Sequence, residues 1–260
     1  MLTTRYVTGS PNWLDLGTPD LEAATDFYAG IFGWTFASAG PEAGGYGMFT
    51  LDGGTAAAGM TVPPEQGPPA WNIYFQSADA AATAEAVRRA GGTVVVEPMD
   101  VFDRGRMAVL ADRAGVGFGI WQPALTKGLD VVNAPGALCW LELYTPDPDA
   151  DLAFYTEVFG WETTAVPYPD GSGSYTMTHP AGESPEAMFA GLVPLAATSS
   201  GTTPHWLPYF AVQNCDATVT RAGSTGATVI TPPVDLQGVG RFAQLSDPWG
   251  ARFAVMQGEG

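Results

Sequence analysis

Two carboxylates and a histidine stand at positions of this sequence from which they could carry out acid–base chemistry. Asp15 and Glu142 occupy equivalent places in a sequence that is written twice, so the duplication could bring them together as a carboxylate pair. Carboxylates that face an apolar cavity usually have a partner or a raised pKa, and either condition can tune proton transfer. His205 could act in the same way. A structural ion pair, or contacts with backbone donors at strand ends, would also explain the carboxylates, and we favour this simpler explanation.

The duplication is visible in the order of the residues. The run Trp13–Asp20 returns as Trp140–Asp147, a shift of 127 positions (140 − 13 = 127). Further along, Trp71 corresponds to Trp206, and the shift has become 135 (206 − 71 = 135). The second copy therefore carries a net insertion of eight residues (135 − 127 = 8), which lies between Trp161 and Trp206. A repeat of this length is typical of two fused copies of one domain, and it is too long for a solenoid.

The length of the chain agrees with two domains. We expect the first domain at residues 1–122, a linker rich in proline and glycine at 123–136, and the second domain at 137–260. Each domain is long enough to bury a core of its own.

The composition is that of a globular chain with a strong negative charge. Hydrophobic residues make up 46% of the sequence and charged residues 14%, which excludes a disordered chain. The 10 basic and 27 acidic side chains give a net charge of −17, which repels nucleic acid and anionic membranes. There is no apolar leader after Met1, no stretch long enough to span a membrane, and the two cysteines fall at unrelated places in the repeat. We therefore expect a cytoplasmic protein without a disulfide.

Each half contains the same order of elements twice. Alternation of apolar and mixed positions predicts a strand at 12–17, and Asp20 caps a helix that ends near Ile31, before Gly33. The remaining elements expected in the first half are a hairpin of strands 46–51 and 55–62, a strand at 71–76, a helix at 79–90, and strands at 93–97, 106–110 and 117–122. The second half repeats this order, with helices at 149–159 and from about Asp216. Each module is therefore one strand, one helix and three strands.

The doubled module resembles the vicinal oxygen chelate superfamily, which includes glyoxalase I, extradiol dioxygenases and bleomycin-resistance proteins. The resemblance is carried by Phe-Tyr-x-x-x-Phe-Gly-Trp at the end of the first helix (Phe27–Trp34 and Phe154–Trp161) and by the turn Asp247-Pro248-x-Gly250. It covers essentially the whole chain, which is most similar to two-domain glyoxalase-like proteins. The implied fold is α+β, with two tandem domains, each of two βαβββ modules that form a cupped sheet. The resemblance does not imply one function, because this fold supports several chemistries and a class that only binds ligands.

The resemblance also implies where metal ligands would stand in a metal-using member, and the residues here do not match. The implied positions are Trp13, Asn72 and Gly119 in the first half, Trp140, Leu207 and Ala254 in the second, and one of 58–60 or 190–192 on the strand before the middle loop. A divalent metal needs three or four N, O or S ligands, which indole, glycine and alanine side chains do not supply. Neither His179, expected at a hairpin tip, nor His205 falls on such a position. We therefore predict no metal site and no cofactor.

Aromatic residues replace the implied ligands. Side chains two apart on a strand share a face. If Trp13 and Trp140 face the cup, the same face carries a set of aromatic and polar side chains. That predicted ligand-binding set is Trp13, Asp15, Asn72, Tyr74, Trp121, Trp140, Glu142, Tyr144, His205, Tyr209 and Arg252. Arg252 is the expected partner of an inward carboxylate. The opposite face, under the helices, carries Leu14, Leu16, Leu141, Leu143, Phe118, Ile120, Phe253 and Val255.

An aromatic face with isolated polar groups favours a planar organic ligand, since rings stack and polar groups set orientation. We therefore predict a metal-free protein that binds an aromatic, natural-product-like small molecule, without nucleic-acid or membrane partners. The alternatives are an enzyme of the same superfamily (lyase, isomerase or oxygenase type) that uses acid–base chemistry or an unplaced metal, and an aromatic barrel packed shut. The sequence leaves open whether a cup forms within one half or across both. It also leaves open whether the protein is a monomer, as an internal pseudo-dimer, or a homodimer.

Overall fold

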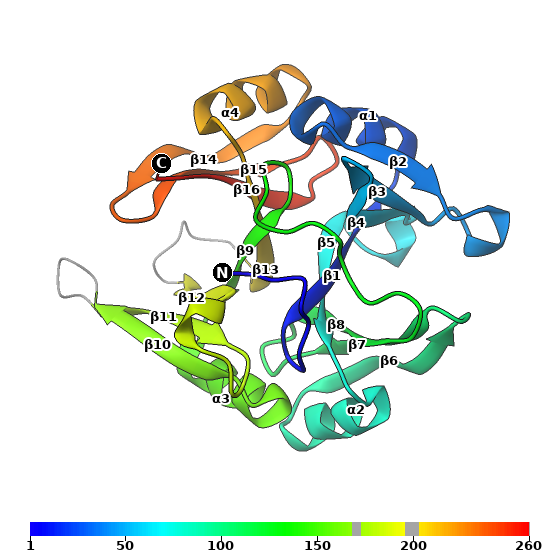
Figure 1. Cartoon of the computed structure of the whole chain (residues 1–260), viewed down its shortest axis with the longest axis vertical. Helices are drawn as coiled ribbons and strands as arrows, with labels where there is room; N and C mark the ends of the chain where they lie inside the picture. The colour runs from blue at the N-terminus through cyan, green and yellow to red at the C-terminus, as the bar shows by residue number, and fades with distance from the viewer. Residues whose placement is uncertain (168–172, 196–202, 260) are drawn as a thin grey trace. The chain divides into compact units, whose positions relative to one another are not determined.

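The first repeat forms one mixed sheet of eight strands with two helices. The computed structural model describes residues 1–167, 173–195 and 203–259 (Figure 1). The strands are β1 (Pro11–Thr18), β2 (Thr35–Ser38), β3 (Gly47–Leu51), β4 (Gly54–Thr61), β5 (Ala70–Gln76), β6 (Thr93–Val101), β7 (Gly105–Ala111) and β8 (Gly117–Pro123). Their order in the sheet is β2-β3-β4-β1-β5-β8-β7-β6. The helices are α1 (Leu21–Phe32) and α2 (Ala80–Arg89).

The second repeat forms a sheet of the same order. Its strands are β9 (Leu138–Thr145), β10 (Glu162–Pro167), β11 (Ser174–His179), β12 (Ala190–Pro194), β13 (His205–Ala211), β14 (Thr228–Leu236), β15 (Gly240–Ser246) and β16 (Arg252–Gly258). They are arranged β10-β11-β12-β9-β13-β16-β15-β14, with helices α3 (Pro148–Phe159) and α4 (Cys215–Ser224). The predicted α+β fold of four βαβββ modules is confirmed. The eight-residue insertion falls in a region that includes 168–172 and 196–202, which lie outside the described residues.

The ends of the first helix in each repeat follow from local sequence. The carboxylates of Asp20 and Asp147 cap α1 and α3 by accepting the backbone N–H three residues on, from Ala23 and Ala150. Gly33 and Gly160 end the helices in the left-handed conformation, at φ 76° and 73°. Only glycine adopts this conformation without a steric cost, which explains the glycine of the repeated aromatic motif.

The chain divides into two compact units that do not coincide with the two halves of the sequence. Unit 1 comprises Met1–Trp13, Ile73–Gly128 and Leu141–Trp206, and unit 2 comprises Leu14–Asn72, Leu129–Trp140 and Leu207–Gly260. Helices α2 and α3 pack together in unit 1, and α1 and α4 pack together in unit 2. Each unit therefore takes its helices from both halves of the sequence.

The core of unit 2 is built on Tyr28 of α1. Its hydroxyl donates to Oδ2 of Asp247 at 3.0 Å and accepts from the indole N–H of Trp71 at 3.1 Å. Phe253 of β16 packs edge-on against the Tyr28 ring, with the centroids 5.7 Å apart. The predicted helix-side position of Phe253 is thereby confirmed. The hydrogen bond of Tyr28 also connects α1 to the turn that begins at Asp247.

The core of unit 1 repeats this arrangement around Tyr155 of α3. The Tyr155 hydroxyl donates to Asp112 Oδ2 at 3.0 Å and accepts from the indole of Trp206 at 3.1 Å. Phe118 packs on the Tyr155 ring at 5.5 Å. Burial raises the pKa of both core tyrosines well above the usual value, so their hydroxyls remain hydrogen-bond donors.

The carboxylates of Asp112 and Asp247 are buried, at 3% and 2% exposed. Asp112 accepts backbone N–H groups from Ala114 and Val116, and Asp247 accepts them from the turn that follows it. Burial, the largest effect, raises the pKa of Asp112 from 3.8 to about 6 in spite of these hydrogen bonds, and it also raises the pKa of Asp247. These aspartates are therefore part of the folding core.

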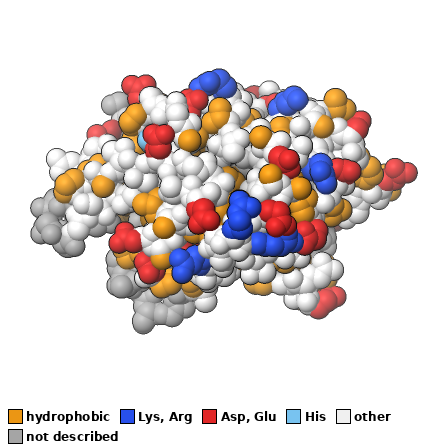
Figure 2. All heavy atoms as spheres, turned by 90° about the horizontal axis from the view of Figure 1, so that it is seen from below, with side chains coloured by type: hydrophobic (Ala, Val, Ile, Leu, Met, Phe, Trp, Pro, Cys, Tyr) orange, Lys and Arg blue, Asp and Glu red, His pale blue; other side chains and the backbone are white. Residues whose placement is uncertain are grey.

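Charged side chains of both signs lie among apolar ones on the surface. Figure 2 shows this mixture on one face of the molecule. Arg241, for example, pairs with Asp216 at 2.7 Å and with Asp235 at 3.0 Å. No helix in the described part of the chain is long and apolar enough to cross a membrane.

Candidate functional site

The first polar cluster, the Asp15 cluster, lies in unit 2 and consists of Asp15, Asn72 and Tyr46. The carboxylate of Asp15 on β1 accepts the side-chain amide of Asn72 on β5 at 2.8 Å and the hydroxyl of Tyr46, just before β3, at 3.3 Å. Asp15 is 2% exposed, whereas Asn72 and Tyr46 are half-buried. The predicted proximity of Asp15 and Asn72 is observed, and both donors are neutral groups.

The second cluster, the Glu142 cluster, lies in unit 1 and consists of Glu142, Tyr144, Tyr175 and His205. Glu142 on β9 accepts the hydroxyl of Tyr144, two residues along the same strand, at 2.6 Å. Its other oxygen accepts the hydroxyl of Tyr175 on β11 at 2.9 Å. Glu142 is half-buried and thus more accessible than Asp15. The carboxylate is held between two phenols.

The imidazole of His205 completes the Glu142 cluster. It stacks on the Tyr144 ring, with centroids 5.0 Å apart and planes 8° from parallel. Its Nδ1 lies 2.8 Å from the backbone carbonyl of Thr203. A carbonyl can only accept, so Nδ1 carries the proton and Nε2 is the basic nitrogen of the neutral ring. The two predicted acid–base residues of the second half therefore share Tyr144 as a neighbour.

Tyr46 and Tyr175 were not predicted as site residues. Both begin a Tyr-x-Met sequence, Tyr46–Met48 and Tyr175–Met177, shifted by 129 positions (175 − 46 = 129). Tyr46 and Tyr175 therefore do not align when the two halves of the sequence are compared at shifts of 127 or 135. Strand pairing places Met48 opposite Ala58 and Met177 opposite Gly191, so the shift has grown to 133 there (191 − 58 = 133). The eight inserted residues are thus distributed before, within and after the β11–β12 hairpin of the second half. For this reason the correspondence of Tyr46 and Tyr175 is not apparent at a single shift.

Gly191 makes room for Tyr175. A Cβ atom at Gly191 would lie 2.0 Å from the Tyr175 hydroxyl oxygen and 2.2 Å from Cζ. Position 191 is also one of those at which the resemblance implies a metal ligand. Any side chain here would displace the tyrosine from Glu142.

We expect Gly191→Ala to destabilise the protein by about 1–3 kcal/mol, because the methyl group must push the Tyr175 ring aside. Urea unfolding measures this cost. In a Tyr175→Ala background the same substitution should cost less than half as much, since the obstructing ring is gone. Gly117→Ala is the matched control, because a Cβ at this strand glycine meets no atom within 4 Å. An equal cost in both backgrounds would show that Tyr175 is not the obstacle.

A second implied ligand position is covered in the same way. A Cβ at Gly119 would lie 2.1 Å from Cδ1 and 2.3 Å from Cε1 of Tyr74, so the tyrosine ring occupies the space of a side chain at this position. Trp13, Trp140, Leu207 and Ala254 have no metal-binding atoms in their side chains. Among the described residues, no three His, Cys, Asp or Glu side chains are grouped to hold a metal ion. The residues at the implied positions do not fit a divalent metal.

The tryptophans of the predicted aromatic face differ in exposure. Trp13 and Trp121 are buried, at 7% and 8% exposed, and the Trp121 indole donates to the carbonyl of Thr126 at 2.9 Å. Trp140 is half-buried. Truncation of Trp13 would leave a cavity in a packed region, so Trp13→Ala would destabilise the fold as well as remove a ring from the aromatic face. Trp140 is the better position for testing ligand contact.

Three other predictions need separate comment. Arg252, the expected partner of an inward carboxylate, is exposed at the first residue of β16, where its guanidinium can stay in water. Tyr209 is buried and accepts a hydrogen bond from the Gln244 amide at 3.3 Å. His179 is the last residue of β11, directly before the connection to the antiparallel strand β12, and it is buried.

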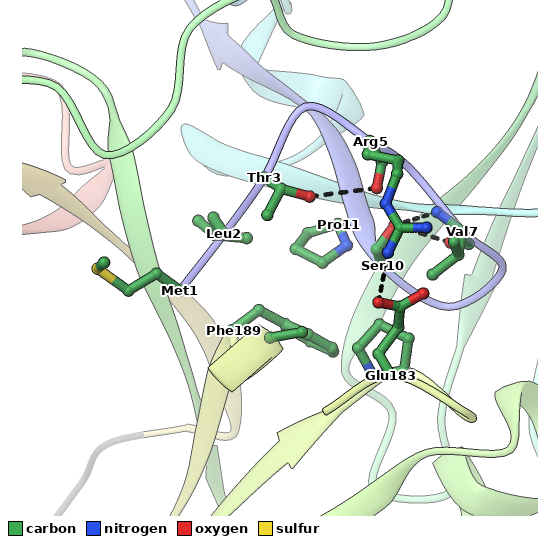
Figure 3. Close-up of a pocket in the computed structure, with 11 residues that line it drawn as sticks. Met1, Leu2, Thr3, Arg5, Val7, Ser10, Pro11, Glu183 and Phe189 are labelled. Carbon is green, nitrogen blue, oxygen red and sulfur yellow. Dashed lines mark hydrogen bonds and ion pairs between the residues drawn. The ribbon is translucent and has the colours of Figure 1, made fainter. Parts of the chain in front are cut away.

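Two hollows lie away from both clusters. One, of about 40 Å³, lies in unit 1 between the N-terminal segment and Phe189, and Figure 3 shows the Arg5–Glu183 ion pair beside it. It is too small for a fused-ring ligand. The other, of about 420 Å³, lies in unit 2 and contains none of the predicted ligand-binding residues. It is lined by Leu51, Asp52, Gly54, Asp130, Val131, Ala134, Pro135 and Gln213.

The chain is similar in sequence to two relatives over nearly its whole length, and similar in fold to a solved glyoxalase. The chain is 39% identical over 269 residues to the anthracycline biosynthesis protein DauV of Streptomyces sp. (strain C5), covering 98% of this chain and 95% of the relative. It is 38% identical over 259 residues to CFP32 of Mycobacterium tuberculosis (strain CDC 1551 / Oshkosh), whose name calls it a glyoxylase, covering 98% and 97%. The Mn(II)-bound glyoxalase from Novosphingobium aromaticivorans shares the fold, with a TM-score of 0.66 at 15% identity, over 96% of this chain and 82% of that one.

The family model of the Glyoxalase/Bleomycin resistance protein/Dioxygenase superfamily matches residues 10–120 and 137–255. These segments fit the two copies of the repeat, and we propose 1–122 and 137–260 as the duplicated domains with 123–136 as their linker. The matches cover most of the chain, and the observed modules are those expected of the family. The chain therefore belongs to the Glyoxalase/Bleomycin resistance protein/Dioxygenase superfamily.

Proposed function

We propose that this protein binds a planar aromatic, natural-product-like small molecule without using a metal. The observation that carries the proposal is the replacement of the implied metal ligands. Two of the positions are glycines covered by tyrosine side chains, Gly119 by Tyr74 and Gly191 by Tyr175. Rings stack on aromatic side chains, and a few polar groups suffice to orient them.

The relatives support a natural-product ligand. DauV, which shares 39% of its residues over nearly the whole chain, is named for anthracycline biosynthesis. Anthracyclines are polycyclic aromatic compounds, the class of molecule that an aromatic face suits. The expectations of a cytoplasmic monomer or homodimer, with no cofactor and no nucleic-acid or membrane partner, belong to the same proposal.

We expect Trp140→Ala to weaken the binding of a fused-ring aromatic compound by tenfold or more, because the variant loses the apolar contact area of the indole in addition to its stacking, which contributes on the order of 1 kcal/mol. Titration of the intrinsic tryptophan fluorescence with planar compounds of two to four fused rings measures the affinity. Trp249→Ala is the matched control: Trp249 is also a half-buried tryptophan of unit 2, but it packs on the helix side, against Phe27 at 6.3 Å.

The control variant should bind like the parent. If no compound of the panel quenches the tryptophan fluorescence saturably, the binding function is refuted. Binding that survives Trp140→Ala would place the ligand elsewhere, and the 420 Å³ hollow beside Asp130 would be the next position to test.

The Glu142 cluster favours a second candidate function, an enzyme that uses acid–base chemistry on such a ligand. A half-buried carboxylate, two phenols and an imidazole with Nε2 as its basic nitrogen can accept and return a proton. Mass spectrometry of the ligand after incubation with the protein distinguishes the two functions. An altered ligand mass or isomer, lost in His205→Gln, would support the enzyme.

A further inference from the structure

The segment that joins the two repeats forms one wall of the 420 Å³ hollow in unit 2. Backbone hydrogen bonds fix its start on β4, because the N–H groups of Asp130 and Val131 both donate to the carbonyl of Thr55, at 2.8 and 3.3 Å. The Thr55 N–H donates in turn to Asp130 Oδ2 at 2.9 Å. Gly54 allows this close approach, since a Cβ atom there would lie 2.6 Å from Cγ2 of Val131.

The end of the same segment is also held in place. The N–H of Gly136 donates to the carbonyl of Ala211, at the end of β13, at 2.7 Å. The carbonyl of Gly136 accepts the indole N–H of Trp34, also at 2.7 Å. Hydrogen bonds at both ends therefore hold the shape of the hollow, and ligand pockets in proteins are usually formed before the ligand arrives.

The lining of the hollow combines apolar surface with negative charge. Leu51 and Val131 supply apolar side chains, and Asp52 and Asp130 supply carboxylates. The eight lining residues include no lysine, arginine or histidine. The volume of about 420 Å³ falls within the range of roughly 300–1,000 Å³ that is usual for pockets that bind small molecules. A ligand that matches this lining has a positive group and an apolar body.

The polar groups of the hollow can accept hydrogen bonds from such a ligand. An ionised carboxylate has about four acceptor sites, of which Asp130 uses one for the Thr55 N–H. Asp52 is exposed in the turn between β3 and β4, at φ 50°, and the amide carbonyl of Gln213 is a further acceptor. A protonated amine carries the donor hydrogens that these groups accept, and hydrogen bonds between ammonium and carboxylate groups are strengthened by charge.

We propose that the 420 Å³ hollow is a second ligand site, which takes a small organic cation: a protonated amine on a compact apolar body. The site goes beyond the proposed binding of planar aromatic compounds, because none of the residues predicted to bind those compounds lines it. The net charge of −17 attracts cations to the molecule. The two aspartates then hold the ammonium group, and Leu51 and Val131 cover the apolar body.

A matched pair of probes tests the site. Cyclohexylmethylamine, which is protonated at neutral pH, and cyclohexylmethanol share an apolar body without an aromatic ring and differ in charge. We expect the parent protein to bind the amine about fivefold to thirtyfold more tightly at low salt, the range that corresponds to two ion pairs at a solvent-accessible site. Titration followed by proton–nitrogen NMR gives both dissociation constants. The backbone amide signals of Gly54 and Val131 and the side-chain amide signal of Gln213 should move.

The double variant Asp52→Asn/Asp130→Asn tests the role of the charge. Asparagine keeps an acceptor oxygen for the Thr55 N–H and tolerates the left-handed backbone of position 52. We expect the variant to bind the two probes within about twofold of each other. Asp26→Asn, on the exposed surface of α1 in the same unit, makes the same chemical change at one residue and should keep the ratio of the parent protein.

The remaining outcomes would overturn the site. Equal binding of the two probes by the parent protein, or no binding of either, shows that the hollow does not select a cation. A preference for the amine that persists in the double variant, or NMR signals that move only in other parts of the chain, places the cation elsewhere. The binding of fused-ring compounds is measured separately with Trp140→Ala, so the proposed function and this site stand or fall independently.

Discussion

Tyr28→Phe is expected to destabilise the protein by about 2–4 kcal/mol, although it removes a single oxygen atom. That oxygen donates to Asp247 at 3.0 Å and accepts from Trp71 at 3.1 Å, in a region where the tyrosine is fully buried. The substitution therefore deprives two buried polar groups of a partner, and each such loss costs about 1–3 kcal/mol. Urea unfolding monitored by circular dichroism at pH 7 measures the change.

The equivalent substitution in unit 1, Tyr155→Phe, should have a similar effect, because its hydroxyl bridges Asp112 and Trp206 at nearly the same distances. Tyr175→Phe provides the control: it also removes a phenol oxygen that donates to a carboxylate, but from a half-buried tyrosine. Its cost should be no more than about 1 kcal/mol. If all three substitutions cost the same, the hydroxyls of the two cores have no special structural role.

The second large effect concerns pH. Burial raises the pKa of Asp112 from 3.8 to about 6, so the fold favours the protonated form of this carboxyl group. The corresponding stabilisation is fully present below the unfolded pKa of 3.8 and is lost as the pH rises through about 6. Relative to an Asp112→Asn variant, which does not titrate there, the free energy of unfolding of the parent protein should fall by about 3 kcal/mol between pH 3.5 and pH 7.

This comparison isolates one group among the 27 acidic residues, whose other contributions appear equally in the parent and the variant. Denaturant titrations of both proteins at half-unit intervals of pH give the difference directly. Glu157→Gln, at an exposed carboxylate, is the control and should run parallel to the parent protein. A constant difference between the parent and Asp112→Asn would mean that Asp112 ionises in the fold as readily as in the unfolded chain.

The sequence by itself determined the architecture, because the features that specify it are local and occur twice. Alternation placed Leu14 and Leu16 on the helix side of β1, and both are fully buried, in a strand whose other residues are buried as well. Asp20 and Gly33 marked the ends of α1 through capping and a positive φ, and these depend only on neighbouring residues. The family followed from these elements and from the repeated aromatic motif.

The sequence also selected residues that the structure brings into two polar clusters. Asp15, Glu142 and His205 were selected from the repeat and from strand parity, and the structure gives each a defined set of partners. Parity places Arg252 on the face of β16 opposite Phe253, and the structure adds that this residue at the strand end is exposed, which keeps its charge in water.

The tertiary structure decided which residues meet. The hydroxyls of Tyr46 and Tyr175 reach the carboxylates across neighbouring strands, and the register that brings them there is set by hairpin lengths that differ between the halves. It also decided that Tyr28 pairs with Asp247, 219 residues away, and that the two compact units take their helices from both halves of the sequence. Such pairings depend on how sheets and helices pack, and the packing energy is shared among residues that are distant in the chain, so no local pattern records it.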